Sequence, residues 1–404
     1  MSGIDLKRER LFILILATVQ FVHMVDFVVM MPLGPVLMEV FTISPAQFGA
    51  LVSSYNFSAG IAGFIFGTIA DRFERKQLLL LSMVGFFIGT MICGLAPTYS
   101  VLLIGRIIAG IFGGVLNVLV FTMVTDIVPF DRRGNAMGII MGAFSVASVL
   151  GVPLGLTIAD FYGWHWTFFF IAFFSLIICF LSFKVLPLFE PTQRNLDWAS
   201  VFKNYLNLMK RKDYLYAYLL IFLVAVSMFV LIPFLSPFAV KNIGIKATDL
   251  KYMYLVGGLC TVFTARWIGK ATDKFGAKKM FMIIAAMSLL PVILFTNAGP
   301  MSLVMYLLLS TLFMTIVSGR MIPCMTLISE VPEMKERGSF MGLLNSIRSM
   351  GSASATLMAG FIIIESDTGT LLHFNWVGWL SIAVVMVTVY MAFRLKIHRF
   401  IPKS

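Results

Sequence analysis

The stretch GTIADRFERK at residues 67–76 recurs, with several changes, as GKATDKFGAK at residues 269–278. The two stretches are 202 residues apart, half the length of the 404-residue chain. A second pair agrees, because RGNAMG at residues 133–138 recurs as RGSFMG at residues 337–342, an offset of 204. Two matches at nearly one offset predict a duplicated fold in which the second half repeats the plan of the first.

Long apolar segments surround both copies. Apolar residues make up 59% of the chain and charged residues only 12%, against roughly 45–50% and roughly 25% in soluble domains. A helical crossing needs about 20 apolar residues, and a backbone in lipid must satisfy its own hydrogen bonds. We therefore expect an all-α integral membrane protein with twelve transmembrane helices, near residues 11–38, 46–70, 77–95, 101–127, 135–159, 165–187, 214–240, 249–269, 280–297, 301–328, 340–364 and 376–393.

The positions of Lys and Arg predict the orientation. Of the 31, twenty-four fall in the two terminal segments and the connections on the same side, three fall in connections on the other side, and four lie within helices. By the positive-inside rule both termini are cytoplasmic. The net charge of +12 therefore reports topology, and we expect no nucleic-acid partner. We expect a multi-pass monomer in the lipid bilayer of a cell membrane, such as a bacterial inner membrane, with the first apolar stretch retained as a helix.

The repeat divides the chain into a six-helix bundle at residues 1–190, a cytoplasmic linker at 191–213 and a second six-helix bundle at 214–404. Apolar residues recur at helical spacing from Trp198 to Met209. This predicts an amphipathic helix lying flat on the inner leaflet. Both a simple tether and a regulatory or partner-binding surface fit this pattern.

The repeated motifs resemble a known family. Residues 67–76 look like the signature loop of the major facilitator superfamily, and residues 269–279 look like its second copy. RIIAGIFGG at 106–114 is similar to the Arg/Gly motif of that superfamily. LGVPLG at 150–155, followed by GWHWTF at 163–168, resembles the exporter branch of drug:proton antiporters and sugar-efflux proteins.

The resemblance implies twelve helices in two pseudo-symmetric six-helix bundles, with a small-molecule site between them near mid-membrane. It implies a transporter rather than an enzyme, without a cofactor. The chain departs from the family pattern in having Glu74 where the first loop usually has Gly, a position that Gly276 keeps in the second. It also has Gly151-Val-Pro153 where exporters have adjacent Gly-Pro.

Charged residues of the repeated loops are candidates for a gate at the cytoplasmic side. A carboxylate there can pair with Arg, or stabilise the positive start of a neighbouring helix such as the one after Gly338. Ordinary snorkelling charges are the alternative. The predicted gating residues are Gly67, Asp71, Arg72, Arg75, Lys76, Asp126, Gly269, Asp273, Lys274 and Lys278.

Asp26 lies deep in the first predicted helix. An ionised carboxylate costs at least about 2.5–3.5 kcal/mol at the membrane centre, so its presence there suggests a function. We predict that Asp26 and Arg106 couple transport to protons, with His23 as a possible relay. A static Asp26–Arg106 pair and a packing role for His23 are the alternatives.

Arginines dominate the membrane interior of the second half, where no acid lies comparably deep. A cavity of that sign favours substrates carrying carboxylate or phosphate, although some of these arginines could pair with acids near the cytoplasm. The predicted substrate-binding residues are Arg320, Arg348, Arg266, Asn117 and Asn56. The fifth helix is rich in glycine, and for it we predict inter-bundle packing through Gly142, Gly151, Pro153 and Gly155; packing within one bundle explains these residues equally well.

Two transport functions remain open from the sequence. One is proton-coupled efflux of a small amphipathic molecule by alternating access. The other is uptake, export or exchange of an organic anion held by the arginines. A membrane enzyme or receptor is disfavoured because the chain has no GxxxxGK[ST], HExxH or GxSxG motif. The four cysteines all lie in apolar runs without ligand spacing, so no metal is expected.

Overall fold

The computed structural model describes residues 6–69, 73–188, 207–333 and 336–395. Asp71, Arg72 and most of the predicted interfacial helix lie outside these residues. The described part of the chain is almost entirely helical, and its only strands are a short antiparallel pair, β1 and β2, before the last helix. The prediction of an all-α membrane protein is confirmed.

The helices of the first half are α1 (Leu6–Val29), α2 (Gly34–Val40), α3 (Pro45–Ile69), α4 (Arg75–Gly94), α5 (Tyr99–Ile127), α6 (Phe130–Val146), α7 (Val152–Tyr162) and α8 (Trp164–Val185). A π-helical turn, Ala147–Gly151, joins α6 to α7. The elements of the second half are α10 (Lys212–Phe229), α11 (Leu235–Phe238), α12 (Leu250–Phe275), α13 (Ala277–Thr296), α14 (Leu303–Gly319), α15 (Met321–Ser329), α16 (Arg337–Ile362), β1 (Ile364–Glu365), β2 (Leu371–Leu372) and α17 (Phe374–Arg394). Short turns, Ile232–Phe234, Ala239–Ile243 and Ala247–Asp249, complete the path from α10 to α12.

Ten helical spans of the described chain are long and apolar enough to cross a membrane. The other two predicted segments coincide with α12 and α16, helices of 26 residues each. These two are less apolar because α12 carries Lys and Arg and α16 carries many Ser and Gly. Helices that face other helices or water tolerate such a composition, whereas helices that face only lipid do not.

Some predicted helices are broken, and proline explains the breaks. The tenth segment divides at Arg320 into α14 and α15. Pro323 has no N–H to donate to the carbonyl of Gly319, so one helical hydrogen bond is missing at this point. Similarly, the first segment ends at Val29, and α2 begins a new helix with Pro35 in its first turn.

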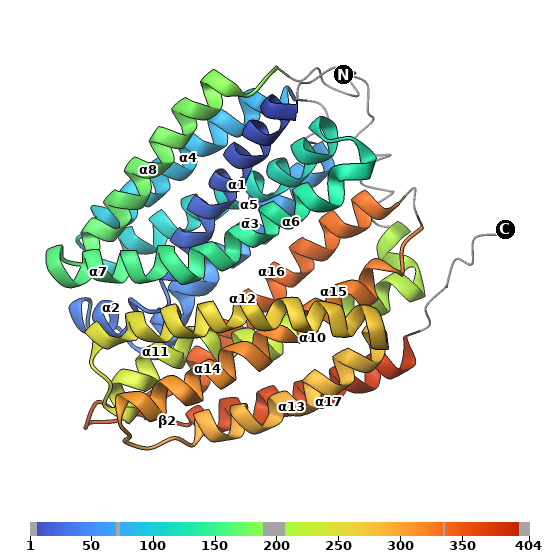
Figure 1. Cartoon of the computed structure of the whole chain (residues 1–404). Helices are drawn as coiled ribbons and strands as arrows, with labels where there is room; N and C mark the ends of the chain where they lie inside the picture. The colour runs from blue at the N-terminus through green and yellow to red at the C-terminus, as the bar shows by residue number, and fades with distance from the viewer. Residues whose placement is uncertain (1–5, 70–72, 189–206, 334–335, 396–404) are drawn as a thin grey trace.

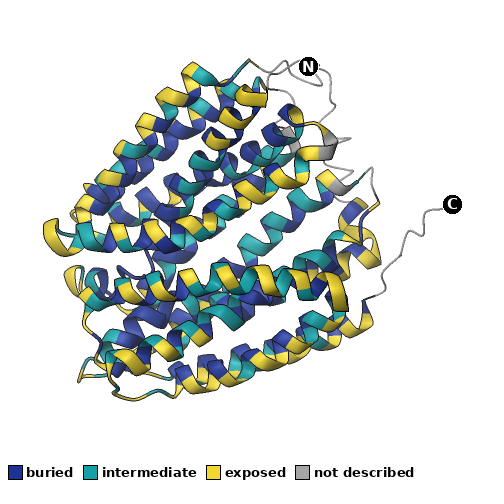
Figure 2. Ribbon diagram, viewed as in Figure 1, coloured by how far each residue is buried: buried dark blue, intermediate teal, exposed yellow. Residues whose placement is uncertain are grey.

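The helices form two groups, α1 to α8 and α10 to α17, which lie close at one end and diverge toward the end that carries both termini (Figure 1). Exposed residues are concentrated on the outer surfaces of both groups (Figure 2). The groups touch along two seams, α3 against α16 and α7 with its preceding π turn against α12. Small residues permit the first seam: a Cβ added at Gly49 would lie 2.9 Å from the backbone oxygen of Thr356.

The two groups are closed together at the end opposite the termini. Phe48 of α3 packs edge-on against Phe234 of the second group, with ring centroids 5.8 Å apart. Lys251 at the start of α12 donates to Asp160 near the end of α7, with Nζ and Oδ2 3.1 Å apart. We call these contacts the distal closure.

The end that carries the termini is open between the groups. A Cβ added at Gly138 or Gly142 in α6, or at Gly269 in α12, would meet no atom within 4 Å. Farther along the same seam, Gly258 of α12 meets Val149 of the π turn. The seam is therefore packed in its distal half and open in its proximal half.

Candidate functional site

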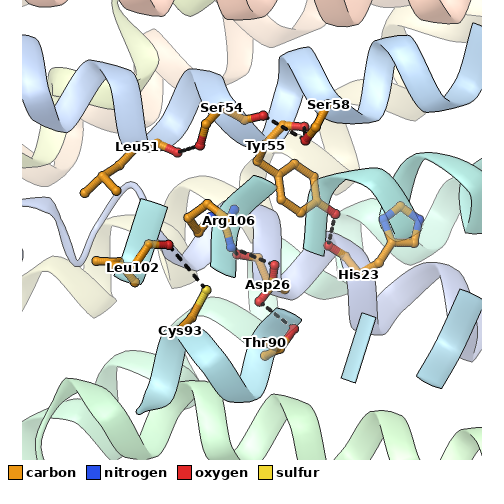
Figure 3. A network of polar contacts seen from close by, with 10 residues as sticks. All are labelled: His23, Asp26, Leu51, Ser54, Tyr55, Ser58, Thr90, Cys93, Leu102 and Arg106. Atoms are coloured by element: carbon orange, nitrogen blue, oxygen red, sulfur yellow. Dashed lines mark hydrogen bonds and ion pairs between the residues drawn. The ribbon is translucent and has the colours of Figure 1, made fainter. Parts of the chain in front are cut away.

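A fully buried ion pair lies in the first bundle. The Asp26 and Arg106 side chains are 0% exposed, and Arg106 Nη1 donates to Asp26 Oδ2 at 2.7 Å (Figure 3). The Thr90 hydroxyl donates to the other carboxylate oxygen, Oδ1, at 3.4 Å. Arg106 Nε and Nη2 have no hydrogen-bond partner among the described residues. Both oxygens of the Asp26 carboxylate therefore accept a hydrogen bond, whereas two of the three guanidinium nitrogens of Arg106 have no partner among the described residues.

Tyr55 of α3 covers the pair from the side of the second bundle. The Arg106 guanidinium carbon lies 4.5 Å from the centroid of its ring, a cation–π contact. The Tyr55 hydroxyl donates to the backbone oxygen of His23 at 3.4 Å. This position depends on glycine, because a Cβ at Gly113 would overlap the Tyr55 hydroxyl and one at Gly110 would collide with the Tyr55 backbone.

A second polar chain runs from α1 toward α5. Gln20 Nε2 donates to Asn117 Oδ1 at 3.1 Å, and His23 Nε2 lies 3.1 Å from Gln20 Oε1. His23 and Gln20 are buried, while Asn117 is partly exposed. Arg106, Gly110, Gly113 and Asn117 follow one another at helical spacing along α5, and α1 and α3 make these contacts to that one face.

Aromatic rings next to the ion pair contact the second bundle. Phe27, the neighbour of Asp26, stacks on Tyr55 at 5.4 Å between ring centroids. Its ring also lies 6.2 Å from Phe229 of α10, across the gap between the bundles. A change at Asp26 is therefore one residue away from a contact that joins the two halves.

The predicted gating residues are placed within their own bundles. Arg75 at the start of α4 forms an ion pair with Asp126 at the end of α5. Lys76 lies over the ring of Phe183 in α8. Lys278 donates to the backbone oxygen of Phe393 at 2.6 Å. In the described part of the chain, no ion pair crosses between the bundles at the proximal end.

One position at which the repeated loops differ is occupied by Glu74 in the first copy and by Gly276 in the second. Glu74 caps α4, its carboxylate accepting from the backbone N–H of Lys76 and of Gln77. Gly276 separates α12 from α13 with φ of 87°, which only glycine adopts easily. Gly67 lies in α3; Gly269, Asp273 and Lys274 lie in the last turns of α12, where both charged residues are exposed.

Two ion pairs occupy corresponding positions in the halves. Arg132 donates to Glu9 at 2.7 Å, and Arg211 donates to Glu336 at 2.7 Å. The offsets 202 and 204 of the sequence repeats relate Glu9 to Arg211 and Arg132 to Glu336, so the same contact is made with its charges exchanged. A second bond, from Arg211 to Glu333 at 2.8 Å, raises the pKa of Arg211.

No carboxylate of the described residues pairs with the predicted substrate-binding arginines Arg320, Arg348 and Arg266. Arg320 is 1% exposed; its Nε donates to the Val317 backbone oxygen at 3.2 Å and its Nη2 has no partner among the described residues. Arg348 is partly exposed and makes no hydrogen bond or ion pair with a described residue, and Arg266 is exposed. In the first half, Asn56 is buried on α3 with its Nδ2 unpaired among described residues.

The glycines of the fifth helix lie differently from the inter-bundle prediction. Gly151 abuts Val25, and Gly155 abuts Val29 and Thr167, all in the first bundle. Gly142 faces open space, and Pro153 lies in the first turn of α7. The inter-bundle contact is made by Val149, because the π turn adds a residue and rotates the face presented to α12.

Several site residues escaped sequence reasoning. Tyr55, Thr90 and Phe27 are common residue types in apolar helices and carry no local signal. Gly110 and Gly113 allow a close approach to α5, yet nothing in the sequence identifies α3 as the helix that approaches. The Lys251–Asp160 pair also carries no signal in the sequence, because both residues lie near the ends of predicted helices, where charges are ordinary.

Comparison with known proteins agrees with this architecture. The sequence model of the Major Facilitator Superfamily matches residues 16–234 and 217–402. The chain is 26% identical over 378 residues to the uncharacterized MFS-type transporter YceJ of Bacillus subtilis, covering 92% of this chain and 94% of that protein. It is 24% identical over 362 residues to multidrug resistance protein 2 of the same organism, covering 88% and 89%.

Among solved structures, the fold matches a bacterial homologue of the human lysosomal transporter Spinster in an inward-facing, occupied conformation, with a TM-score of 0.78, 15% identity and 97% of each chain covered. It also matches the nucleoside transporter NupG, with a TM-score of 0.76, 15% identity and 96% and 99% coverage. At 15% identity, these matches show a similar fold and nothing more.

Proposed function

This chain belongs to the major facilitator superfamily of membrane transporters, and from that premise we propose that it is a proton-coupled exporter of a small amphipathic molecule. Residues 1–190 and 214–404 are the two bundles, and they rock about the cleft between them. Both termini lie in the cytoplasm, so the open proximal end faces the cytoplasm and the distal closure faces outward. The described conformation is then open to the inside.

The buried Asp26–Arg106 pair is the observation that carries this proposal. Arg106 keeps its charge at any accessible pH, so Asp26 is the partner that can gain or lose a proton. Protonation of Asp26 would leave a charge with no counter-ion in the membrane interior, at a cost of about 3–5 kcal/mol for a broken buried pair. A cost of that size is comparable to what is needed to exchange two conformational populations.

The surroundings of the pair supply a path from this charge to the bundle interface. Phe27 follows Asp26 in the sequence, and its ring contacts those of Tyr55 and Phe229. We propose that movement of the α1 backbone on protonation withdraws Phe27 from Phe229 and weakens the distal closure. Gln20, His23 and Asn117 extend from the pair toward the proximal opening and form the route by which the proton leaves.

The exporter direction is supported by the resemblance of residues 150–168 to the exporter branch and by a relative named as a multidrug resistance protein. A transporter of this kind uses the proton gradient, and one charge crossing 100 mV supplies about 2.3 kcal/mol. The location in a bacterial inner membrane belongs to the same proposal.

The test is proton flux in liposomes containing the purified full chain and a pH-sensitive dye. Ethidium, chloramphenicol and fluorescein represent cationic, neutral and anionic amphipaths. We expect at least one of them to drive proton release from the wild type and not from Asp26→Asn. Asp249→Asn, which removes a carboxylate away from the pair, serves as the matched control and should keep the coupling. Proton release that persists in Asp26→Asn excludes the coupling role of Asp26.

A second candidate is an organic anion as the substrate. It is favoured by Arg320, a buried guanidinium without a carboxylate partner among the described residues, and by Arg348, which is partly exposed on α16. Planar carboxylates and phosphates satisfy such a guanidinium through two parallel hydrogen bonds. If fluorescein alone is transported, with no dependence on Asp26, this candidate replaces the first.

A further inference from the structure

An apolar groove runs between α4 and α8 on the outer surface of the first bundle, away from the cleft. It is shallow and widely open, with a volume of about 630 Å³, and its lining is almost wholly apolar, including Leu80 of α4 and Phe173, Phe180 and Phe183 of α8. Phe173, Phe180 and Phe183 are each more than half exposed. Figure 1 shows α4 and α8 side by side on the outer surface of their bundle, where the surrounding medium is the hydrocarbon of the bilayer.

The length of the groove matches one leaflet. Phe173 and Phe183 are ten residues apart on one helix, or about 15 Å at 1.5 Å per residue. Half of a hydrocarbon core of about 30 Å is the same length. A single acyl chain lying along the groove would therefore reach from mid-membrane to the proximal surface.

Two cations stand at the proximal end of the groove. Lys76 in the first turn of α4 has its Nζ 5.4 Å from the centroid of Phe183, and Lys184 in the last turn of α8 has its Nζ 4.4 Å from the centroid of Phe180. Neither ammonium is in an ion pair with a described residue. The neighbouring Glu74 carboxylate accepts backbone hydrogen bonds at the start of α4, and Arg75 is paired with Asp126.

We propose that this groove binds an anionic phospholipid of the leaflet on the side of the termini, with one acyl chain along Phe173 to Phe183 and the phosphate between Lys76 and Lys184. The apolar lining selects the chain, and the two ammonium groups select the charge of the headgroup. Basic residues beside transmembrane helices at the cytoplasmic surface recognise anionic headgroups in this way.

The proposed lipid site lies next to a helix that takes part in the contact between the two bundles. Lys76 follows the loop that joins α3 to α4, and α3 forms the seam with α16. A lipid held on α4 and α8 would tie the start of α4 to the membrane surface while the bundles rock. The binding proposal itself does not depend on the transported substrate.

Native mass spectrometry of the purified full chain tests the proposal, using phosphatidylglycerol and phosphatidylcholine with identical acyl chains. We expect the wild type to bind phosphatidylglycerol preferentially. Each ammonium near an anionic headgroup contributes about fivefold, so Lys76→Gln with Lys184→Gln should reduce that preference by about thirtyfold. Lys76→Arg with Lys184→Arg should keep it, as should the matched control Lys274→Gln with Lys279→Gln, which removes two charges from the second bundle.

Three outcomes would overturn the proposal. The preference could survive the double Gln substitution. Glycerophosphoglycerol, which has the headgroup without chains, or inorganic phosphate could displace the lipid, which would mean that the groove plays no part. A dimer that forms through α4 and α8 and excludes lipid would assign the groove to a second copy of the chain. Circular dichroism of each variant verifies that it is folded.

Discussion

The Asp26–Arg106 pair makes an asymmetric prediction for stability. Asp26→Asn leaves the Arg106 guanidinium charged, 0% exposed and without a counter-ion among the described residues. Breaking a buried pair in this way costs about 3–5 kcal/mol. Arg106→Gln leaves a carboxylate that can be neutralised by a proton and that keeps the Thr90 hydroxyl, so its cost is that of an unsatisfied polar group, about 1–3 kcal/mol. We expect Asp26→Asn to be the more damaging change.

The double substitution Asp26→Asn with Arg106→Gln completes the cycle. It leaves two neutral amides that can bond to each other, so its cost should be smaller than the sum of the single costs by about 1–3 kcal/mol. Equilibrium unfolding in mixed micelles measures all four free energies of unfolding. Additivity within about 0.5 kcal/mol, or a larger loss for Arg106→Gln than for Asp26→Asn, would refute the reasoning.

Three further substitutions test other contacts. Gly113→Ala should destabilise the first bundle by about 1–3 kcal/mol, because its Cβ overlaps the Tyr55 hydroxyl, whereas Gly142→Ala meets no atom within 4 Å and should be tolerated in the same unfolding assay; equal losses would contradict this. Lys251→Ala removes the partly exposed pair with Asp160, which is worth about 1 kcal/mol or less. It should raise the population that is open at the distal end by up to about fivefold, measured from distances between spin labels on the two bundles. An unchanged population would contradict the role of this pair in the distal closure. Arg320→Met should leave the melting temperature unchanged or higher, since it replaces a buried charge that has no carboxylate partner among the described residues. It should also abolish any protection by fluorescein; a large fall in melting temperature would instead reveal a structural partner.

The helix breaks illustrate what the sequence could and could not predict. Composition and run length predicted the helical segments, because hydrocarbon penalises every unsatisfied backbone group and every exposed charge. The same reasoning missed the breaks at Val29 and Arg320. A proline in an apolar run can end, bend or be absorbed by a helix, and the neighbouring helices decide which of these occurs.

The sequence also revealed unequal amounts about the contacts of the predicted site residues, for a similar reason. Asp26 and Arg106 stood out because charges are rare at such depth, and the structure brings them together across 80 residues of sequence. The glycines of the fifth helix were conspicuous in composition, yet Gly151 and Gly155 pack inside their own bundle. A small residue predicts that another helix approaches closely but does not identify that helix, whereas a buried charge predicts a partner of the opposite charge.

A helical membrane protein with two similar halves and one deeply buried acid can be predicted from the sequence alone. Each of these follows from local composition or from repetition along the chain, which require no knowledge of neighbours. The packing of the helices shows in addition that Tyr55 and Phe27 connect the acid to the second bundle, that the distal end is closed and that the proximal end is open. Such contacts depend on how the two bundles are placed against each other, and this placement involves residues far apart in the sequence.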